Sequence, residues 1–122
     1  MQVPEFKKIA KIESTTLGVE DHGIFTAFLN VTYGGAGQGV GGYCLDRYDK
    51  EAKKRVGTAY GCEFIARLIR ACGVDSWEKV KGRTIFVLHE NNEHGKVIGI
   101  ENLPTEKGNR FIFADLFEEL PA

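Results

Sequence analysis

The chain has 122 residues with 43% hydrophobic and 27% charged side chains, which is typical of one globular domain spanning residues 1–122. A formal net charge of −1 excludes a strong overall attraction to DNA or to an anionic membrane, and no apolar stretch reaches membrane-spanning length. Any anion site must therefore be a local concentration of positive charge.

The cysteines and the first residues predict a cytoplasmic protein, and neither a metal nor a cofactor is expected. The three cysteines are an odd number without a Cys-x-x-Cys pair, so we expect them to be reduced. The three histidines show no zinc-ligand spacing with them. Residues 1–6 lack the apolar core of a signal peptide.

The first third of the chain predicts an antiparallel hairpin. Residues 6–12 carry apolar side chains among lysines and are expected to form an edge strand, and the polar residues 13–23 are expected to form a turn. Residues 24–33 alternate apolar and polar side chains, which is typical of a strand with one buried face. A returning strand is expected through residues 43–45.

One strong helix is predicted in the middle of the chain. The charged residues 46–56 are expected to form a loop or a surface turn. From residue 59 to residue 72 apolar side chains recur at helical spacing, with Thr58 in place as the N-cap and Gly73 as the stop.

The remainder of the chain predicts a second hairpin and a final element. Residues 83–89 are expected to form a strand buried on both faces, followed by a turn at residues 91–95 and a return strand at residues 96–100. A short C-terminal helix is expected within residues 111–120. The fold is therefore predicted to be α+β, with an antiparallel sheet of about five strands, one principal helix and a short C-terminal helix.

A glycine-rich run at residues 33–43 (YGGAGQGVGGY) contains six glycines among eleven residues. Glycine weakens regular structure and is favoured where the backbone needs positive φ or where another group approaches the main chain closely. Successive bare N–H groups can form an anion-binding concavity, so Gly35, Gly37, Gln38 and Gly39 are candidate phosphate contacts. The run lacks the known phosphate-loop fingerprints, and a bulged hairpin connection is the alternative.

A second candidate anion site precedes the predicted helix. Arg55 follows two lysines, and Gly57 and Thr58 stand at the helix N-terminus, where unpaired N–H groups and the helix dipole attract anions. The alternative is a solvated run of charge in front of an ordinary capped helix.

Two further positions could contact a nucleotide. Arg110 next to Phe111 places a cation beside an aromatic ring, although Phe111 and Phe113 are also suited to the core. Asn92 could recognise a base edge by hydrogen bonds, although asparagine is also favoured in tight turns for its own reasons.

The triplet Glu20-Asp21-His22 is the most enzyme-like feature of the sequence. Two carboxylates beside an imidazole can act as a general base or hold a metal. Adjacent strand residues point to opposite faces, so the three converge only if the chain turns there. A hydrogen-bonded turn before residue 24 is the alternative, and no catalytic residue is assigned.

Three segments resemble small proteins of tailed phages and prophages: residues 14–24 (STTLGVEDHGI), residues 33–43 and residues 56–61 (VGTAYG). Within that group the chain resembles, over about residues 9–102, the Thoeris anti-defence one family. The resemblance implies a protein in the cytoplasm of an infected bacterium that sequesters cyclic ADP-ribose isomers, made by TIR-domain enzymes, without cleaving them. It also implies dimers that assemble into larger homo-oligomers, and some members capture cyclic di- or trinucleotides.

The expected function is therefore non-catalytic binding of a cyclic ADP-ribose isomer. Bidentate cations or backbone N–H groups would hold its pyrophosphate, and an aromatic face would hold its adenine. Because a chain this short has little room for a deep pocket, we expect the ligand at an interface between protomers. The alternatives are an enzyme that degrades such a signal with Glu20, Asp21 or His22, and a phage protein that inhibits a host protein through an exposed apolar face.

Overall fold

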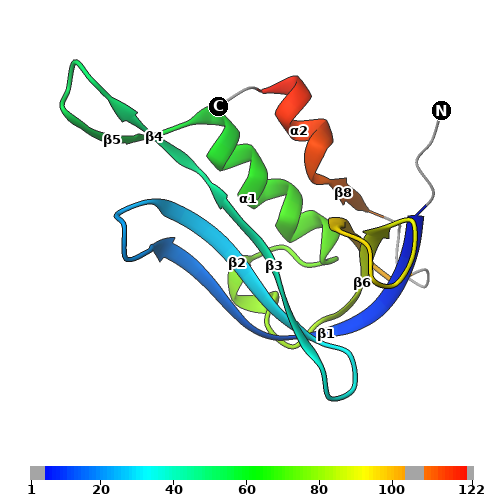
Figure 1. The fold of residues 1–122 in the computed structure, drawn as a ribbon. Coiled ribbons are helices and arrows are strands. Elements are labelled where there is room, and N and C mark those ends of the chain that lie inside the picture. The colour runs from blue at the N-terminus through cyan, green and yellow to red at the C-terminus, as the bar shows by residue number, and fades with distance from the viewer. Residues whose placement is uncertain (1–4, 104–108, 121–122) are drawn as a thin grey trace.

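The computed structural model describes residues 5–103 and 109–120 and confirms the α+β prediction (Figure 1). The polar connection expected around residues 104–108 lies outside the described residues. Within the described ranges, a large antiparallel sheet has six strands where about five were predicted, and a main helix and a short C-terminal helix accompany it.

The elements follow one another through short connections. The strands are β1 (Glu5–Val19), β2 (Phe25–Thr32), β3 (Gly37–Cys44), β4 (Asp46–Asp49), β5 (Lys54–Gly57), β6 (Thr84–Glu90), β7 (Val97–Glu101) and β8 (Arg110–Ile112). The helical segments are α1 (Ala59–Ala71), the 3-10 helix η1 (Trp77–Lys79) and α2 (Phe113–Glu119). None of the helices in the described ranges has the length and apolar character needed to cross a membrane.

β1 lies in the middle of the main sheet, so the prediction of an edge strand is wrong. The strand order is β3-β2-β1-β6-β7-β8, and β4 and β5 form a separate two-stranded sheet. The first half of β1 pairs with β6 through residues 5–11, and the second half pairs with β2 through residues 11–19. The polar stretch after Ile12 is therefore strand and not turn, because threonine suits a strand and only one face of an antiparallel sheet needs to be apolar.

The core lies between α1 and one face of the sheet, which curves around the helix in Figure 1. Tyr60, Phe64 and Leu68 are each at most 2% exposed and recur every fourth residue, as one helix face requires. They belong to one cluster with Leu29 and Val31 of β2, which alternate with more exposed residues. The predicted apolar stripe of the helix is therefore confirmed.

The segment before α1 differs from its prediction, whereas α1 itself agrees. Residues 46–57 form the β4–β5 hairpin and not a loop, and this hairpin projects beyond the helices (Figure 1). The predicted N-cap is confirmed, because the Thr58 side chain accepts a hydrogen bond from Gly61 N. Gly73 follows the helix with a φ of +74°, as the predicted stop.

The C-terminal segment is a short strand followed by a short helix. Phe111 in β8 and Phe113 in α2 are both 2% exposed, and their ring centroids lie 5.0 Å apart, edge to face. Their centroids also lie 5.1 and 5.7 Å from that of Phe64 in α1. The core role that the sequence allowed for these two rings is confirmed.

Candidate functional site

The glycine-rich run forms the tight turn between β2 and β3 and most of β3 itself. Gly34 and Gly35 have φ values of +67° and +122°, and Tyr33 N donates to Ala36 O at 2.8 Å, so Gly35 serves a two-residue hairpin turn. The other predicted ligand contacts of the run lie in β3: Gly37, Gln38 and Gly39. The register of β2 and β3 shifts between Thr26 and Phe28, at the end of the hairpin away from this turn, so the bulge lies within the paired strands and the connection itself is a regular tight turn.

The ring of Phe28 packs against the main chain of β3 at Gly39. A Cβ on residue 39 would lie 2.3 Å from Phe28 Cζ, so glycine is what leaves room for the ring. Phe28 points to the face opposite α1, because its neighbours Ala27 and Leu29 are fully buried on the helix side. The half-buried ring is therefore an aromatic surface on the solvent-facing side of the sheet.

A recess of about 410 Å³ opens beside this ring, and we call it the Phe28 recess. Seven residues line it: Thr16, Glu20, Ile24, Thr26, Phe28, Gly42 and Cys44. Its volume falls within the range of roughly 300–1,000 Å³ that small-molecule sites occupy. Its lining offers one aromatic ring, two hydroxyl groups and one carboxylate, and these are groups that suit a base and a sugar.

Arg55 lies next to the Phe28 recess, because it contacts Cys44, which lines the recess. Arg55 Nη2 lies 3.4 Å from Cys44 Sγ, and Arg55 Nε and Nη2 donate to the Asp46 carboxylate at 2.9 and 2.8 Å. These hydrogen bonds from Arg55 lower the pKa of Asp46, which is 9% exposed, to about 2. The carboxylate thus stays ionised at neutral pH and fixes the direction of the guanidinium, whose Nη1 makes no hydrogen bond with a described residue.

Gly57 and Thr58 hold the start of α1 against β4. Thr58 Oγ1 donates to Leu45 O and accepts from Gly61 N, both at 2.8 Å. Gly57 ends β5, opposite the first residue of β4. The Arg55 guanidinium pairs with Asp46 of β4, and neither Gly57 nor Thr58 lines the Phe28 recess.

The remaining predicted ligand residues lie away from the Phe28 recess and do not line it. Arg110 pairs with Glu101 at 2.8 Å and, through both terminal nitrogens, with Glu5 at 2.7 and 3.0 Å. Phe111 is in the core. Asn92 lies in the exposed turn between β6 and β7, where its side-chain oxygen accepts a backbone N–H of the same turn at 2.9 Å.

The Glu20-Asp21-His22 segment forms the turn between β1 and β2. Glu20 Oε1 accepts from the backbone N–H groups of His22 and Ile24 at 2.6 and 3.3 Å, and Oε2 lies 3.0 Å from His22 Nδ1. The hydrogen bond with the His22 side chain lowers the pKa of Glu20. The hydrogen-bonded turn is therefore confirmed. No three His, Cys, Asp or Glu side chains among the described residues are grouped so that they could hold a metal ion.

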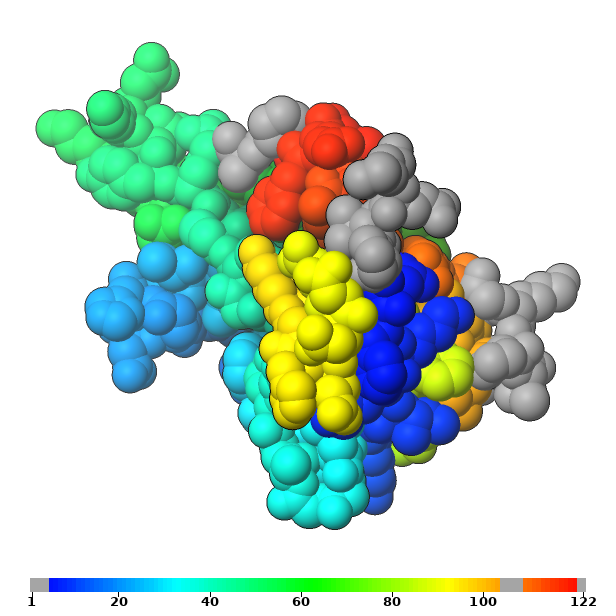
Figure 2. Space-filling view, turned by 45° about the vertical axis from the view of Figure 1, so that its right-hand side comes forward, coloured from blue at the N-terminus to red at the C-terminus, as the bar shows by residue number. Residues whose placement is uncertain are grey.

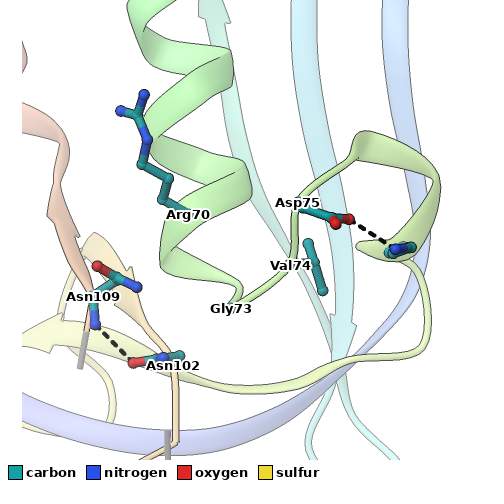
Figure 3. Close-up of a pocket in the computed structure, with 7 residues that line it drawn as sticks. Arg70, Gly73, Val74, Asp75, Asn102 and Asn109 are labelled. Carbon is teal, nitrogen blue, oxygen red and sulfur yellow. Dashed lines mark hydrogen bonds and ion pairs between the residues drawn. The ribbon is translucent and has the colours of Figure 1, made fainter. Parts of the chain in front are cut away.

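A second cavity, of about 590 Å³, lies at the C-terminal end of α1 (Figure 3). Asp75 and Lys79 pair with each other there at 2.8 Å, and Asn109 N donates to Asn102 Oδ1 at 2.8 Å. The seven residues that line the cavity include no aromatic ring, and none of them was predicted as a site residue. It therefore lacks the base-stacking surface of the Phe28 recess.

Sequence reasoning missed Phe28, Cys44 and Asp46. Phe28 had a usable signal, because it is a large aromatic residue at a polar-face position of the predicted strand at residues 24–33. Cys44 and Asp46 had no such signal, since they become relevant only when the β4–β5 hairpin folds back and brings Arg55 to them.

Comparison with protein-family models, curated proteins and solved structures finds no match for this chain. The candidate site therefore rests on its own chemistry. Where the main sheet meets the β4–β5 hairpin, the surface combines an aromatic ring, a carboxylate and an arginine that a second carboxylate orients. Together these groups are complementary to a small ligand with a planar base, hydroxyl groups and a phosphate.

Proposed function

We propose that the protein binds and sequesters a cyclic ADP-ribose isomer without cleaving it, and so counteracts Thoeris antiphage defence in the cytoplasm of an infected bacterium. The observation that carries the proposal is the Phe28 recess with Arg55 at its border. The resemblance of three segments to the Thoeris anti-defence one family supports the choice of ligand class.

Each part of such a ligand has a partner at the recess. The adenine stacks on the ring of Phe28, which is worth about 1–3 kcal/mol per base in proteins that bind nucleotides by stacking. Glu20 already accepts three hydrogen bonds within its turn, and a carboxylate has about four lone-pair positions, so it can also accept a ribose hydroxyl. Arg55 Nη1 donates to the pyrophosphate.

The geometry of Arg55 favours tight binding. Because Asp46 already holds the guanidinium, little side-chain entropy is lost when a phosphate binds to its remaining N–H groups. The recess is open on the solvent-facing side of the sheet, so a second protomer that covers it would enclose the ligand. The proposed active form is therefore a homo-oligomer built from dimers, with the ligand at an interface.

The test is calorimetric titration of the protein with cyclic ADP-ribose isomers, followed by heat denaturation and mass analysis of the released ligand. Intact ligand in stoichiometric amount is the expected result. Phe28→Ala and Arg55→Gln should each weaken binding about tenfold or more, which corresponds to about 1.4 kcal/mol. Phe6→Ala and Arg47→Gln are the matched controls, because both side chains are exposed and neither lines the recess. A titration that shows no heat of binding would refute the proposal. An equal loss of ligand affinity in the variants and in the controls would refute it as well.

One observation favours an enzyme as the second candidate function. The Glu20–His22 pair lies at the rim of the recess with a 3.0 Å contact, and such a pair can activate water for cleavage of a bound nucleotide. Recovery of a cleaved product at catalytic protein amounts, abolished in His22→Ala, would establish this alternative.

Thermal shift separates both nucleotide functions from inhibition of a host protein. A ligand at about 100 times its dissociation constant adds about 2.7 kcal/mol to the free energy of unfolding. The panel includes cyclic di- and trinucleotides, since the same base and phosphate chemistry would bind them. A melting temperature that no nucleotide raises would favour the host-protein inhibitor.

A further inference from the structure

The first half of β1 has an unpaired edge in the middle of the sheet. Residues 5–11 of β1 pair with β6, but pairing with β2 begins only at Lys11, opposite Thr32. Along residues 5–10, no described strand lies on the β2 side of β1. β1 is thus an internal strand at one end and an open edge at the other.

The pairing pattern shows which backbone groups face the open edge. Ile12 N donates to Arg83 O and Ile12 O accepts from Gly82 N, both at 2.8 Å, so the backbone groups of Ile12 point towards β6. Successive residues of an antiparallel strand direct their N–H and C=O groups to opposite sides. Lys7 and Ile9 therefore direct their backbone N–H and C=O groups away from β6, into the open edge.

A recess of about 570 Å³ lies along this edge, and we call it the β1-edge recess. It is lined by residues 6–11 of β1, by residues 32–34 at the end of β2, and by Thr84 and Glu93. Figure 2 shows the start of β1 (dark blue), the β2–β3 turn (cyan) and the β6–β7 turn (yellow) meeting on one face of the molecule. The recess is distinct from the Phe28 recess, with which it shares no lining residue.

The β1-edge recess carries an excess of positive charge in a chain whose formal net charge is −1. Lys7, Lys8 and Lys11 line it, against the single carboxylate of Glu93. Lys7 pairs with Glu101 at 2.7 Å, and Lys8 Nζ lies 4.2 Å from the centroid of the Tyr33 ring. Lys11 has no ion pair with a described residue. The charge of this edge therefore favours an acidic occupant.

The same lysines disfavour a second copy of the chain as that occupant. Two copies that paired antiparallel about the centre of this edge would place like charges directly opposite each other, which destabilises a sheet. A two-fold axis through Lys7 or Lys8 sets that residue against its own copy, and an axis through Ile9 sets Lys7 against Lys11. Lysines are a common protection of sheet edges against self-association, and they leave the edge open to a partner of opposite charge.

We propose that the edge of β1 at residues 6–10 accepts an extended acidic segment of a partner protein as an added strand. The backbone of Lys7 and Ile9 supplies the strand hydrogen bonds, as in other complexes in which a peptide extends a sheet. Lys7 and Lys11 share one face of β1, so a partner residue opposite Ile9 has both as diagonal neighbours. The neighbouring partner residue points to the other face, where Lys8 lies.

The test uses fluorescence anisotropy with the full chain and a labelled peptide, Thr-Val-Thr-Glu-Glu-Thr-Val-Thr. The adjacent glutamates place one carboxylate on each face of the added strand. We expect binding that weakens as salt is added, and binding at least about tenfold weaker for the counterpart with two lysines. A peptide that is N-methylated at both glutamates should also bind at least about tenfold weaker, because in either register one of these two adjacent N–H groups donates a strand hydrogen bond to β1.

Three variants of the protein complete the test. Ile9→Pro removes an N–H that faces the open edge and no bond to β6, so it should abolish peptide binding and leave the circular dichroism spectrum unchanged. Lys11→Glu reverses an exposed charge and should reduce the preference for the acidic peptide over the basic one. Phe28→Ala should leave peptide binding unchanged, which keeps this result independent of the nucleotide proposal. Equal binding of the acidic, basic and N-methylated peptides, or no binding of any, would overturn the inference.

Discussion

The ring of Phe28 occupies the space that a side chain at position 39 would need, since a Cβ there would lie 2.3 Å from Phe28 Cζ and 2.7 Å from Cε2. The atoms in conflict are the far end of one side chain, so Gly39→Ala displaces the ring at little cost in stability. We expect nucleotide affinity to fall about tenfold in calorimetry as stacking is lost. Gly37→Ala is the control, because Gly37 does not line the recess and a Cβ there makes only an ordinary contact of 3.7 Å with Val31 O. Equal affinity of both variants for the nucleotide would show that the Phe28 ring does not contribute to ligand binding.

The reactivity of Cys44 should report occupancy of the Phe28 recess. Cys44 and Cys62 are exposed, whereas Cys72 is fully buried and burial raises its pKa to about 12. We expect iodoacetamide to alkylate Cys44 and Cys62 in the native protein and Cys72 only after denaturation.

A bound cyclic ADP-ribose isomer should slow alkylation of Cys44, which lines the recess, and leave Cys62 unaffected. Peptide mapping by mass spectrometry gives the three rates separately. Protection of both exposed thiols to the same degree would indicate a general stabilisation of the fold and not occupancy of this site.

The elements that local pattern determines were predictable from the sequence. The helix at residues 59–71 shows an apolar stripe, an N-cap at Thr58 and a stop at Gly73, and all three are present. The strand at residues 25–32 alternates, and its alternation matches the burial. In these segments one side of the element meets the core. The spacing of the apolar residues in the sequence therefore repeats with the period of the helix or strand.

The position of β1 and the composition of the site were not predictable in the same way. The strand changes its partner near Lys11, and a pattern of side chains along one strand does not reveal which strand lies on each side. The recess likewise depends on a contact across strands between Phe28 and Gly39. The Arg55–Asp46 pair depends on a hairpin that the charged composition of residues 46–56 made to look like a loop. These are tertiary relationships, which override local propensity.

One buried tyrosine and one partly buried tyrosine provide a paired test of hydrogen bonding. The Tyr60 side chain is 2% exposed, and its hydroxyl has no hydrogen-bond partner among the described residues. Tyr33 Oη, in contrast, donates to Gln38 Oε1 at 2.6 Å. Tyr60→Phe should leave the free energy of unfolding unchanged or raise it by about 1 kcal/mol, and Tyr33→Phe should lower it by about 1 kcal/mol.

Urea denaturation monitored by circular dichroism measures both changes under one condition. Each substitution retains the ring, so the packing of Tyr60 on Phe117, with ring centroids 5.1 Å apart, is preserved. A loss in Tyr60→Phe as large as that in Tyr33→Phe would mean that the Tyr60 hydroxyl has a partner outside the described residues.

The Asp46–Arg55 pair should make part of the stability depend on acid pH. The pKa of Asp46 is about 2 in the folded protein against an ordinary value of 3.8, because Arg55 hydrogen-bonds to the ionised carboxylate. The folded state therefore favours the charged form, so this contribution is complete above the ordinary value and is lost as the pH falls towards about 2. Since Arg55 is 31% exposed, solvent screens the pair and we expect a contribution of about 1 kcal/mol.

A double-mutant cycle with Asp46→Asn and Arg55→Gln isolates this contribution from other titrating groups. At about pH 6 the two substitutions should couple, with the double variant more stable than the sum of the single losses implies. Near pH 2 the coupling should shrink, because about half of Asp46 is then protonated in the wild-type protein as well. A coupling energy that stays constant over this range would show that the pair interacts through packing and not through charge, and would weaken the argument that Asp46 orients Arg55 for a phosphate.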